Sequence, residues 1–213
     1  MSLQDQKKLN FAIFLIWLFH ISGIIGIASG SQKWFIEKTP LNFLACTLLF
    51  VWIYPMQTLR KWMVFGLFFM MGMFAEWLGA NHSILFGSYD YGNNLGPKFD
   101  GVPLFIGINW ALLTFITAEV ASKFLKNIWF KAFLGAGLMV FLDFLMEQSA
   151  PAFDFWSFGE EVPLENYITW YLLALLFHFV FHKVKLSGNY AFSLNLFLVQ
   201  VAFFGYFMLF PVA

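Results

Sequence analysis

Three acidic side chains lie inside segments that are otherwise almost wholly apolar: Glu76, Asp143 and Glu147. Asp143 and Glu147 are four residues apart, so a helix would place both carboxyl groups on one face. Two close carboxylates in a low-dielectric environment do not both ionise readily, and one is expected to keep its proton at neutral pH. A protonated carboxyl group in an apolar cavity is suited to general acid catalysis.

A packing role is the alternative for these acids, which could pair with His20, His82 or amide groups and only fix neighbouring helices. Ionisable side chains in a membrane-spanning helix are costly and usually face the protein interior, however. We therefore expect Glu76, Asp143 and Glu147 to form a catalytic group. His20, in the middle of the first apolar segment, is either a buried packing residue or part of the same site.

Two further aspartates, Asp90 and Asp154, lie among aromatic residues between apolar segments. Such residues often form turns, but their matched placement favours a role in the site, with Asp90 as a further catalytic candidate. The amides of Asn109 and Asn166 could orient a water or a carboxylate. Aromatic candidates for the wall of a binding site, which could instead be interfacial or packing residues, are Trp77, Tyr89, Tyr91, Trp110, Trp156 and Trp170.

The composition indicates an all-α polytopic membrane protein with about seven transmembrane helices. The 213 residues are 61% hydrophobic, 22% aromatic and only 11% charged, whereas about a quarter of the residues of a soluble domain are charged. Apolar runs long enough to span a bilayer recur along the chain. The expected spans are 11–28, 41–58, 63–80, 102–121, 129–147, 167–182 and 192–211.

Charge and cysteine content exclude several functions. The net charge is zero, which gives no reason to expect a nucleic-acid partner, and the single cysteine, Cys46, cannot form an intrachain disulfide. No metal-binding motif is present. The short polar start of the chain precedes a long apolar segment without a small-residue cleavage pattern, so we expect a retained helix and not a signal peptide.

Lys and Arg residues predict the orientation in the membrane. With seven spans, nine of these residues fall on one side and three, Lys33, Lys38 and Lys98, on the other. The N-terminus is expected in the cytoplasm and the C-terminus outside, in a bacterial cytoplasmic membrane. The two long loops, 81–101 and 148–166, then share the non-cytoplasmic side.

An internal repeat relates two parts of this single 1–213 domain, approximately 63–121 and 129–182. Val102-Pro103-Leu104 precedes Trp110 by the same spacing that separates Val162-Pro163-Leu164 from Trp170. Each proline begins a helix, where its fixed φ is favourable. We expect two parallel helical hairpins that enclose a cavity between them.

The residues also resemble the carotenoid biosynthesis membrane proteins over about 40–182. In the first part of the chain, the resemblance rests on Glu76-x-x-Gly79, Phe86-Gly-x-Tyr-x-Tyr91 and Gly101-Val-Pro103 with Trp110. In the second part, it rests on Asp143-x-x-x-Glu147, Ala150-Pro-Ala152, Trp156 and Val162-Pro163-x-x-Asn166-x-x-x-Trp170.

This resemblance implies a hydratase that adds water to the terminal C1–C2 double bond of an acyclic carotenoid, such as lycopene or γ-carotene, without a cofactor. The expected partners are the lipophilic carotenoid and membrane lipid. A carboxyl group would protonate the alkene, aromatic faces would stabilise the tertiary cation, and water would capture it.

Two alternatives stay open at this point. A lycopene-cyclase-like isomerase would form the same cation and quench it with an internal alkene. A non-enzymatic transporter of small molecules would place its polar groups near the middle of the membrane. A retinal pigment is disfavoured because the last apolar segment, 192–211, contains no lysine for a Schiff base.

Overall fold

The computed structural model describes residues 2–159 and 161–212. Long helices dominate it, and the short strands lie in the loops between them. In chain order the elements are α1 (Leu3–Gly26), the π-helical turn η1 (Ile27–Ser31), α2 (Gln32–Ile36), α3 (Thr39–Ile53), α4 (Leu59–His82), β1 (Tyr89–Tyr91), β2 (Lys98–Phe99), β3 (Val102–Pro103), α5 (Leu104–Phe124), α6 (Ile128–Glu147), β4 (Trp156–Phe158), α7 (Leu164–Lys183) and α8 (Tyr190–Leu209).

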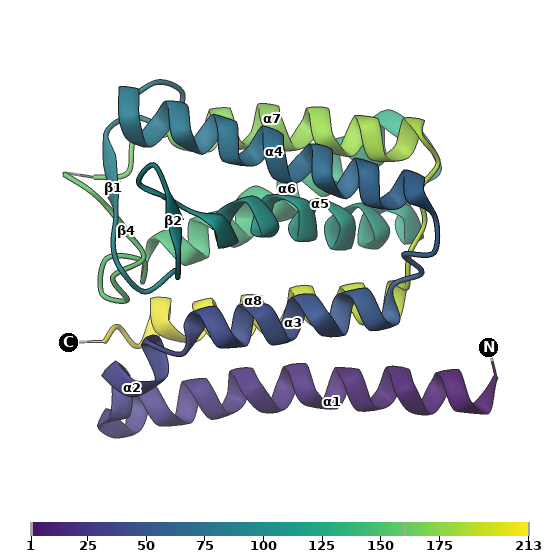
Figure 1. Cartoon of the computed structure of the whole chain (residues 1–213), viewed down its shortest axis with the longest axis horizontal. Coiled ribbons are helices and arrows are strands. Elements are labelled where there is room, and N and C mark those ends of the chain that lie inside the picture. The colour runs from purple at the N-terminus through teal and green to yellow at the C-terminus, as the bar shows by residue number, and fades with distance from the viewer. Residues whose placement is uncertain (1, 160, 213) are drawn as a thin grey trace.

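The helices run side by side along the long axis of the molecule, and the chain passes back and forth between the two ends of the bundle (Figure 1). The N-terminus lies at one end and the C-terminus at the other, as an odd number of passes requires. Helix α5 forms the core: two thirds of its residues are buried, from Ile106 to Ala121. All four strands lie at the end of the bundle that holds the C-terminus.

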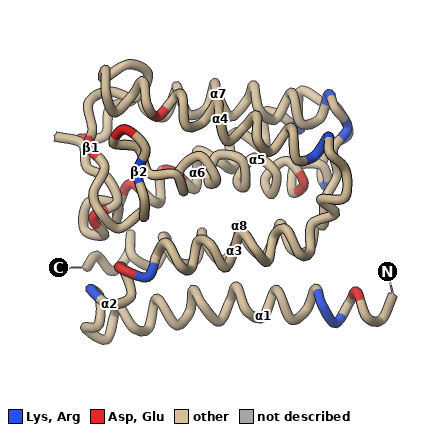
Figure 2. Tube along the Cα trace, in the orientation of Figure 1, with Lys and Arg blue, Asp and Glu red and all other residues tan. Residues whose placement is uncertain are grey.

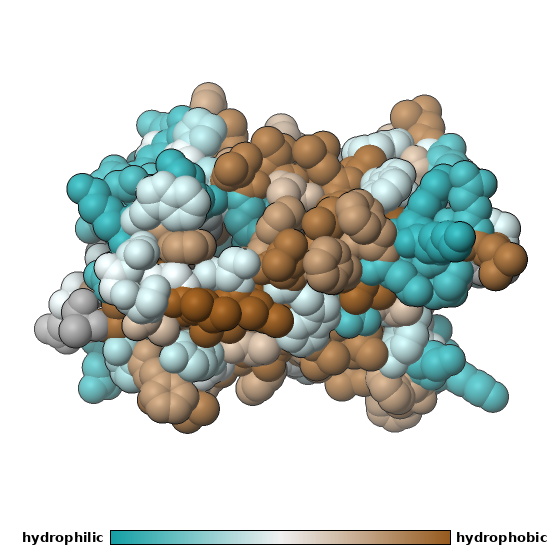
Figure 3. Space-filling view, turned by 90° about the horizontal axis from the view of Figure 1, so that it is seen from below, coloured by the Kyte–Doolittle hydropathy of each residue, from teal (hydrophilic) through white to brown (hydrophobic). Residues whose placement is uncertain are grey.

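The fold is that of an integral membrane protein. Within the described residues, six helices are long and apolar enough to cross a bilayer: the α1–α2 run, α4, α5, α6, α7 and α8. A hydrophobic band separates hydrophilic surfaces at the two ends of the molecule (Figure 3). The prediction of an all-α polytopic membrane protein is confirmed.

Helix α3 is shorter than the predicted span of 41–58. It ends at Ile53, and Tyr54 adopts an extended conformation with ψ of 135°. The reason is Pro55, which disfavours helical geometry in the residue before it. The pass that α3 makes, the second in chain order, is therefore formed by only 15 helical residues. The hydropathy pattern continues to residue 58 and so does not show where the helix ends.

The first segment also differs from its predicted range of 11–28. Helix α1 begins at Leu3 because the Ser2 side chain and Asp5 form a reciprocal N-terminal cap. At the other end, Gly30 has φ of 93°, which turns the chain so that α2 packs back toward α1. Only glycine adopts this left-handed conformation at little cost.

The two long loops meet through their strands, as expected for loops on one side of the membrane. Strand β1 pairs antiparallel with β4, so that Tyr89 lies opposite Phe158 and Tyr91 opposite Trp156. Strands β2 and β3 form a second pair within the first loop. Sequence analysis matched the two aromatic segments as repeats, but did not predict that they pair with each other.

Basic residues gather at one end of the bundle. Figure 2 shows most of the Lys and Arg segments at the end that holds the N-terminus, opposite the strands. At that end, Arg60 and Lys61 begin α4, and Lys183 ends α7. The nine-to-three division of charges thus corresponds to the two ends of the molecule.

Candidate active site

The three carboxyl groups predicted from the sequence line one cavity near the strand-bearing end of the bundle. The cavity has a volume of about 20 Å³ for the centre of a water-sized sphere, which is room for roughly one water. Helices α4, α5, α6 and α7 and strands β1 and β4 form its wall. The lining residues are Glu76, Tyr89, Tyr91, Ile106, Asn109, Asp143, Met146, Glu147, Trp156, Phe158, Asn166 and Trp170.

Glu76 is held by three hydrogen-bond donors and is only 3% exposed. The Tyr89 and Tyr91 hydroxyls donate to its Oε2 atom at 2.6 and 2.7 Å. The Trp110 indole N–H donates to Oε1 at 2.8 Å. Donors on both oxygens favour the ionised form of this carboxyl group and hold it in one position.

The two tyrosines keep the protons that they donate. Burial, reinforced by the nearby Glu76 carboxylate, raises the pKa of the Tyr89 and Tyr91 phenols well above the ordinary value. Both side chains come from β1 and point to the same face because they are two residues apart on a strand. The pairing of β1 with β4 therefore positions the donors that anchor Glu76.

Glu147, at the end of α6, has two donors. The Trp156 indole N–H donates to Oε2 at 2.8 Å, and the Asn166 amide donates to Oε1 at 3.1 Å. These contacts come from β4 and α7, so the second loop and the following helix fix this carboxylate. Sequence analysis assigned Asn166 to the orientation of a water or a carboxylate, and in the structure it contacts a carboxylate.

Asp143 differs from the other two acids. It is 2% exposed, and its Oδ2 atom is buried without a hydrogen-bond partner among the described residues. An ionised carboxylate in that position would be very unfavourable without a partner. Among the described residues, the cavity wall contains no Lys, Arg or His that could neutralise it. Asp143 is thus suited to carry a proton.

Trp110 and Trp170, the matched tryptophans of the repeat, stack on each other. Their ring centroids are 3.8 Å apart with an interplanar angle of 16°. Each lies in a helix that begins directly after a proline, Trp110 in α5 after Pro103 and Trp170 in α7 after Pro163. Gly72 of α4 permits this arrangement, because a Cβ atom there would lie 2.6 Å from the Trp110 side chain.

Six of the candidate residues lie outside the cavity wall, among them Trp110, which reaches Glu76 only through its indole N–H. Asp90 is exposed on β1, on the face opposite to its tyrosine neighbours. Asp154 is also exposed, and its carboxylate accepts a hydrogen bond from the Asn93 backbone N–H at 2.9 Å. Asp154 therefore joins the two loops instead of facing the carboxyl groups.

Trp77 and His82 contact each other outside this cavity, and His20 lines a different cavity. The Trp77 indole donates to Asp100 at 2.7 Å, and its ring packs edge-to-face against exposed His82. His20 is buried, with its Nδ1 atom 2.7 Å from the Ile16 carbonyl oxygen. His20 therefore does not pair with any of the three acids.

Some cavity residues were not in the predicted set. Ile106, Met146 and Phe158 are apolar residues whose position cannot be distinguished from ordinary core packing in the sequence. By contrast, the sequence did indicate Asn109 as an amide that could orient a water or a carboxylate, and it lines the cavity from α5. No group of three or more His, Cys, Asp or Glu side chains in the described chain is arranged to hold a metal ion.

These features define a polytopic membrane protein with a buried acid cluster at one end of a helical bundle. Comparison with known families identifies the family: residues 39–212 match the family model of the carotenoid biosynthesis protein. The chain belongs to this family, as the resemblance in the sequence indicated. No curated protein and no solved structure matches it.

Proposed function

We propose that the protein is a carotenoid hydratase, which adds water to the terminal C1–C2 double bond of an acyclic carotenoid end group. The observation that carries the proposal is the buried Asp143 Oδ2 atom, which has no hydrogen-bond partner in the described chain and lies at a cavity with room for about one water. Family membership supports a carotenoid as the substrate. An acid and a site for water are the two requirements of alkene hydration.

Asp143 is the proposed general acid, since its buried Oδ2 atom has no hydrogen-bond donor in the described chain to stabilise the ionised form. Its proton is transferred to C2 of the alkene, and the π electrons form the new C–H bond. A tertiary cation remains at C1. The distribution of hydrogen bonds supports this choice among the three acids, which the sequence left open.

Glu147 is the proposed general base. Water bonds to C1 through its oxygen, and the proton that it releases is taken up by Glu147, which Trp156 and Asn166 hold in place. Transfer of that proton back to Asp143, one helical turn away on α6, restores the starting state. The net change is the addition of one water, with no oxidant, reductant or cofactor.

Glu76 and the aromatic rings stabilise the cation in this proposal. A fixed negative charge in a low-dielectric cavity attracts a developing positive charge strongly. The rings of Tyr91, Trp156 and Trp170 line the same cavity, and aromatic faces attract cations. Both contributions are preorganised, because the hydrogen bonds of Glu76 already exist before substrate binds.

The site lies at the end of the bundle with few basic residues. We propose that this end faces away from the cytoplasm of a bacterial cell, with the N-terminus inside, because the opposite end holds most Lys and Arg residues (Figure 2). The two paired loops then cover the mouth of the site on the outer side.

Expression in a host that accumulates lycopene or γ-carotene tests the function. The expected result is a carotenoid whose mass has increased by one water, measured by mass spectrometry of extracted pigments. The Asp143→Asn variant, matched in size, is the control and should leave the pigments unchanged at equal protein yield. Lack of a hydrated product from any acyclic carotenoid would overturn the proposal, and a new pigment of unchanged mass would identify an isomerase.

A further inference from the structure

A large apolar groove lies beside the end of α1, on the other side of the molecule's core from α4. Its volume is about 480 Å³, within the range of small-molecule sites. Helices α1, α2 and α3 provide most of the wall, with one residue from the second loop and one from α8. The residues that the argument uses are His20, Trp34, Asn42, Ala45, Phe153 and Phe203.

A smaller chamber of about 90 Å³ adjoins the groove. The two spaces share four wall residues: His20, Thr39, Asn42 and Phe203. The chamber in turn shares Asn109 and Met146 with the cavity that holds the three carboxyl groups. The three spaces are therefore neighbours in series, from the flank of α1 to the acid cluster.

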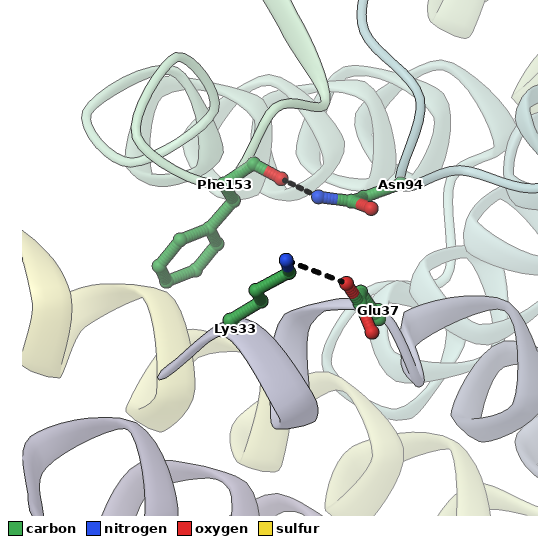
Figure 4. Close-up of polar contacts among 4 residues, drawn as sticks. All are labelled: Lys33, Glu37, Asn94 and Phe153. Atoms are coloured by element: carbon green, nitrogen blue, oxygen red, sulfur yellow. Dashed lines mark hydrogen bonds and ion pairs between the residues drawn. The ribbon is translucent and has the colours of Figure 1, made fainter. Parts of the chain in front are cut away.

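The loop that carries β4 also forms part of the groove. Phe153 lines the groove and packs edge-to-face against Phe207 of α8, with ring centroids 5.1 Å apart. Its carbonyl oxygen accepts a hydrogen bond from Asn94 of the first loop at 3.0 Å. Figure 4 shows this contact together with the Lys33–Glu37 ion pair of α2, at 4.0 Å. The joined loops thus connect the groove wall to the site.

We propose that this series of spaces binds the hydrocarbon chain of the substrate and delivers its end to the carboxyl groups. The inference rests on the proposed function and adds the route and the side of access. The apolar chain would lie in the groove and the inner chamber, while the end group passes Asn109 and Met146. The substrate would enter sideways between α1 and α3, from the hydrocarbon part of the bilayer.

The wall of the groove fits a long apolar ligand in membrane contact. Trp34 and Leu41, which line it, are 58% and 63% exposed, so the groove reaches the surface that lipid covers. Most of the remaining wall is apolar, and three of its polar residues, His20, Thr39 and Asn42, also line the chamber. Burial of hydrocarbon against such a wall needs no polar partner.

A second groove provides a control. It has a volume of about 410 Å³ and is lined by α4, α5 and the first loop, through Phe69, Met70, Met73, Phe74, Trp77, Phe99 and Leu104. It is also apolar and of similar size, but it shares no wall residue with the acid cavity. The shared wall residues that relate the first groove to the acid cavity, by way of the chamber, therefore distinguish the proposed route from the other groove.

Blocking variants test the route separately from the chemistry. Ala45→Trp should fill the proposed groove, Ala45→Ser should leave it open, and Met70→Trp should add the same ring to the other groove. Each is combined with Asp143→Asn, so that binding is measured without turnover. The measurement is the amount of lycopene or γ-carotene that co-purifies per protein in lipid nanodiscs, determined by absorbance.

In the Asp143→Asn background, we expect Ala45→Trp to reduce the amount of bound carotenoid by at least tenfold. In the chain with Asp143 intact, it should reduce hydration by at least tenfold. The Ala45→Ser and Met70→Trp variants should stay within twofold of the parent in both measurements. Equal binding and hydration in Ala45→Trp would overturn the route while leaving the proposed function intact. A third outcome is that the parent binds carotenoid, Ala45→Trp does not, and the chain with Asp143 intact forms no hydrated product. This outcome would support the route and refute the hydratase. Loss in Met70→Trp alone would assign binding to the other groove.

Discussion

The two hairpins α4–α5 and α6–α7 share a framework and differ in their polar side chains. In both, a proline precedes the second helix, and a tryptophan follows seven residues later, at Trp110 or Trp170. In both, the connecting loop contributes a strand to the β1–β4 pair. The acids, however, have different partners: Glu76 has three donors, whereas the Asp143 Oδ2 atom has none in the described chain.

This difference indicates how a repeated framework can acquire separate chemical roles. One hairpin holds a carboxylate rigidly through two phenols and an indole, which suits electrostatic stabilisation. The other hairpin carries two acids on one helical face, and only one of them is held by donors. If the hydrogen-bond donors around each acid determine its role, substitutions in the two hairpins should affect different measured quantities.

The largest expected effect is that of Asp143→Asn on the rate. Removal of a general acid typically costs between about 10²- and 10⁴-fold, and the amide cannot donate a proton to an alkene. We expect a loss of hydration within this range, measured as product formed per protein, with unchanged yield in the membrane. A variant with half of the parent activity or more would remove Asp143 from the acid role.

Glu76→Gln should affect stability more than Asp143→Asn does. The amide nitrogen of the new side chain would face a donor, and a buried donor without an acceptor costs about 1–3 kcal/mol. We expect a lower thermal unfolding temperature in detergent, together with a reduced rate. If Asp143→Asn destabilises the protein as much as Glu76→Gln, the proposed difference between the acids of the two hairpins is wrong.

The stacked tryptophans allow a finer test. Trp110→Phe removes the N–H that donates to Glu76, whereas Trp170→Phe removes no side-chain hydrogen bond to another described residue and leaves an aromatic ring in the stack. A hydrogen bond to a charged group contributes about 1.5–3 kcal/mol. Trp110→Phe should therefore lower the free energy of unfolding by more than Trp170→Phe does. Equal losses would show that ring packing, and not the hydrogen bond, dominates at both positions.

The smallest effect is expected for Asp90→Asn. The side chain is exposed on β1, on the face opposite to Tyr89 and Tyr91, and surface substitutions usually change stability by no more than about 0.5 kcal/mol. Hydration should stay within twofold of the parent chain in the same pigment assay. A loss comparable to that of Asp143→Asn would restore Asp90 as a catalytic residue.

Much of the architecture and the central acids could be predicted because their signals are local. Apolar length marks the helices, and rare carboxyl groups inside them mark the site. The spacing of Pro103 and Pro163 to their tryptophans indicated matched hairpins. The hydrogen-bond partners of Glu76 could not be predicted, since they depend on the register of β1 against β4 across distant loops.

The candidate residues that lie outside the acid cavity show a second limit of prediction from sequence, the direction of each side chain. Trp77 directly follows Glu76, yet successive side chains on a helix point about 100° apart, and Trp77 reaches Asp100 instead. His20 has the chemistry of a site residue but lies on α1, beside the groove and the chamber. Residue type predicted candidates, while the direction of each side chain required the structure.

Short helix α3 has a consequence for the surrounding lipid. Its 15 residues extend about 22 Å at 1.5 Å per residue, against a hydrocarbon thickness of about 30 Å. Such hydrophobic mismatch thins the bilayer locally or draws flanking residues inward. Because α3 also forms one side of the lateral groove, the length of the lipid acyl chains should tune how readily a membrane-dissolved substrate enters the protein.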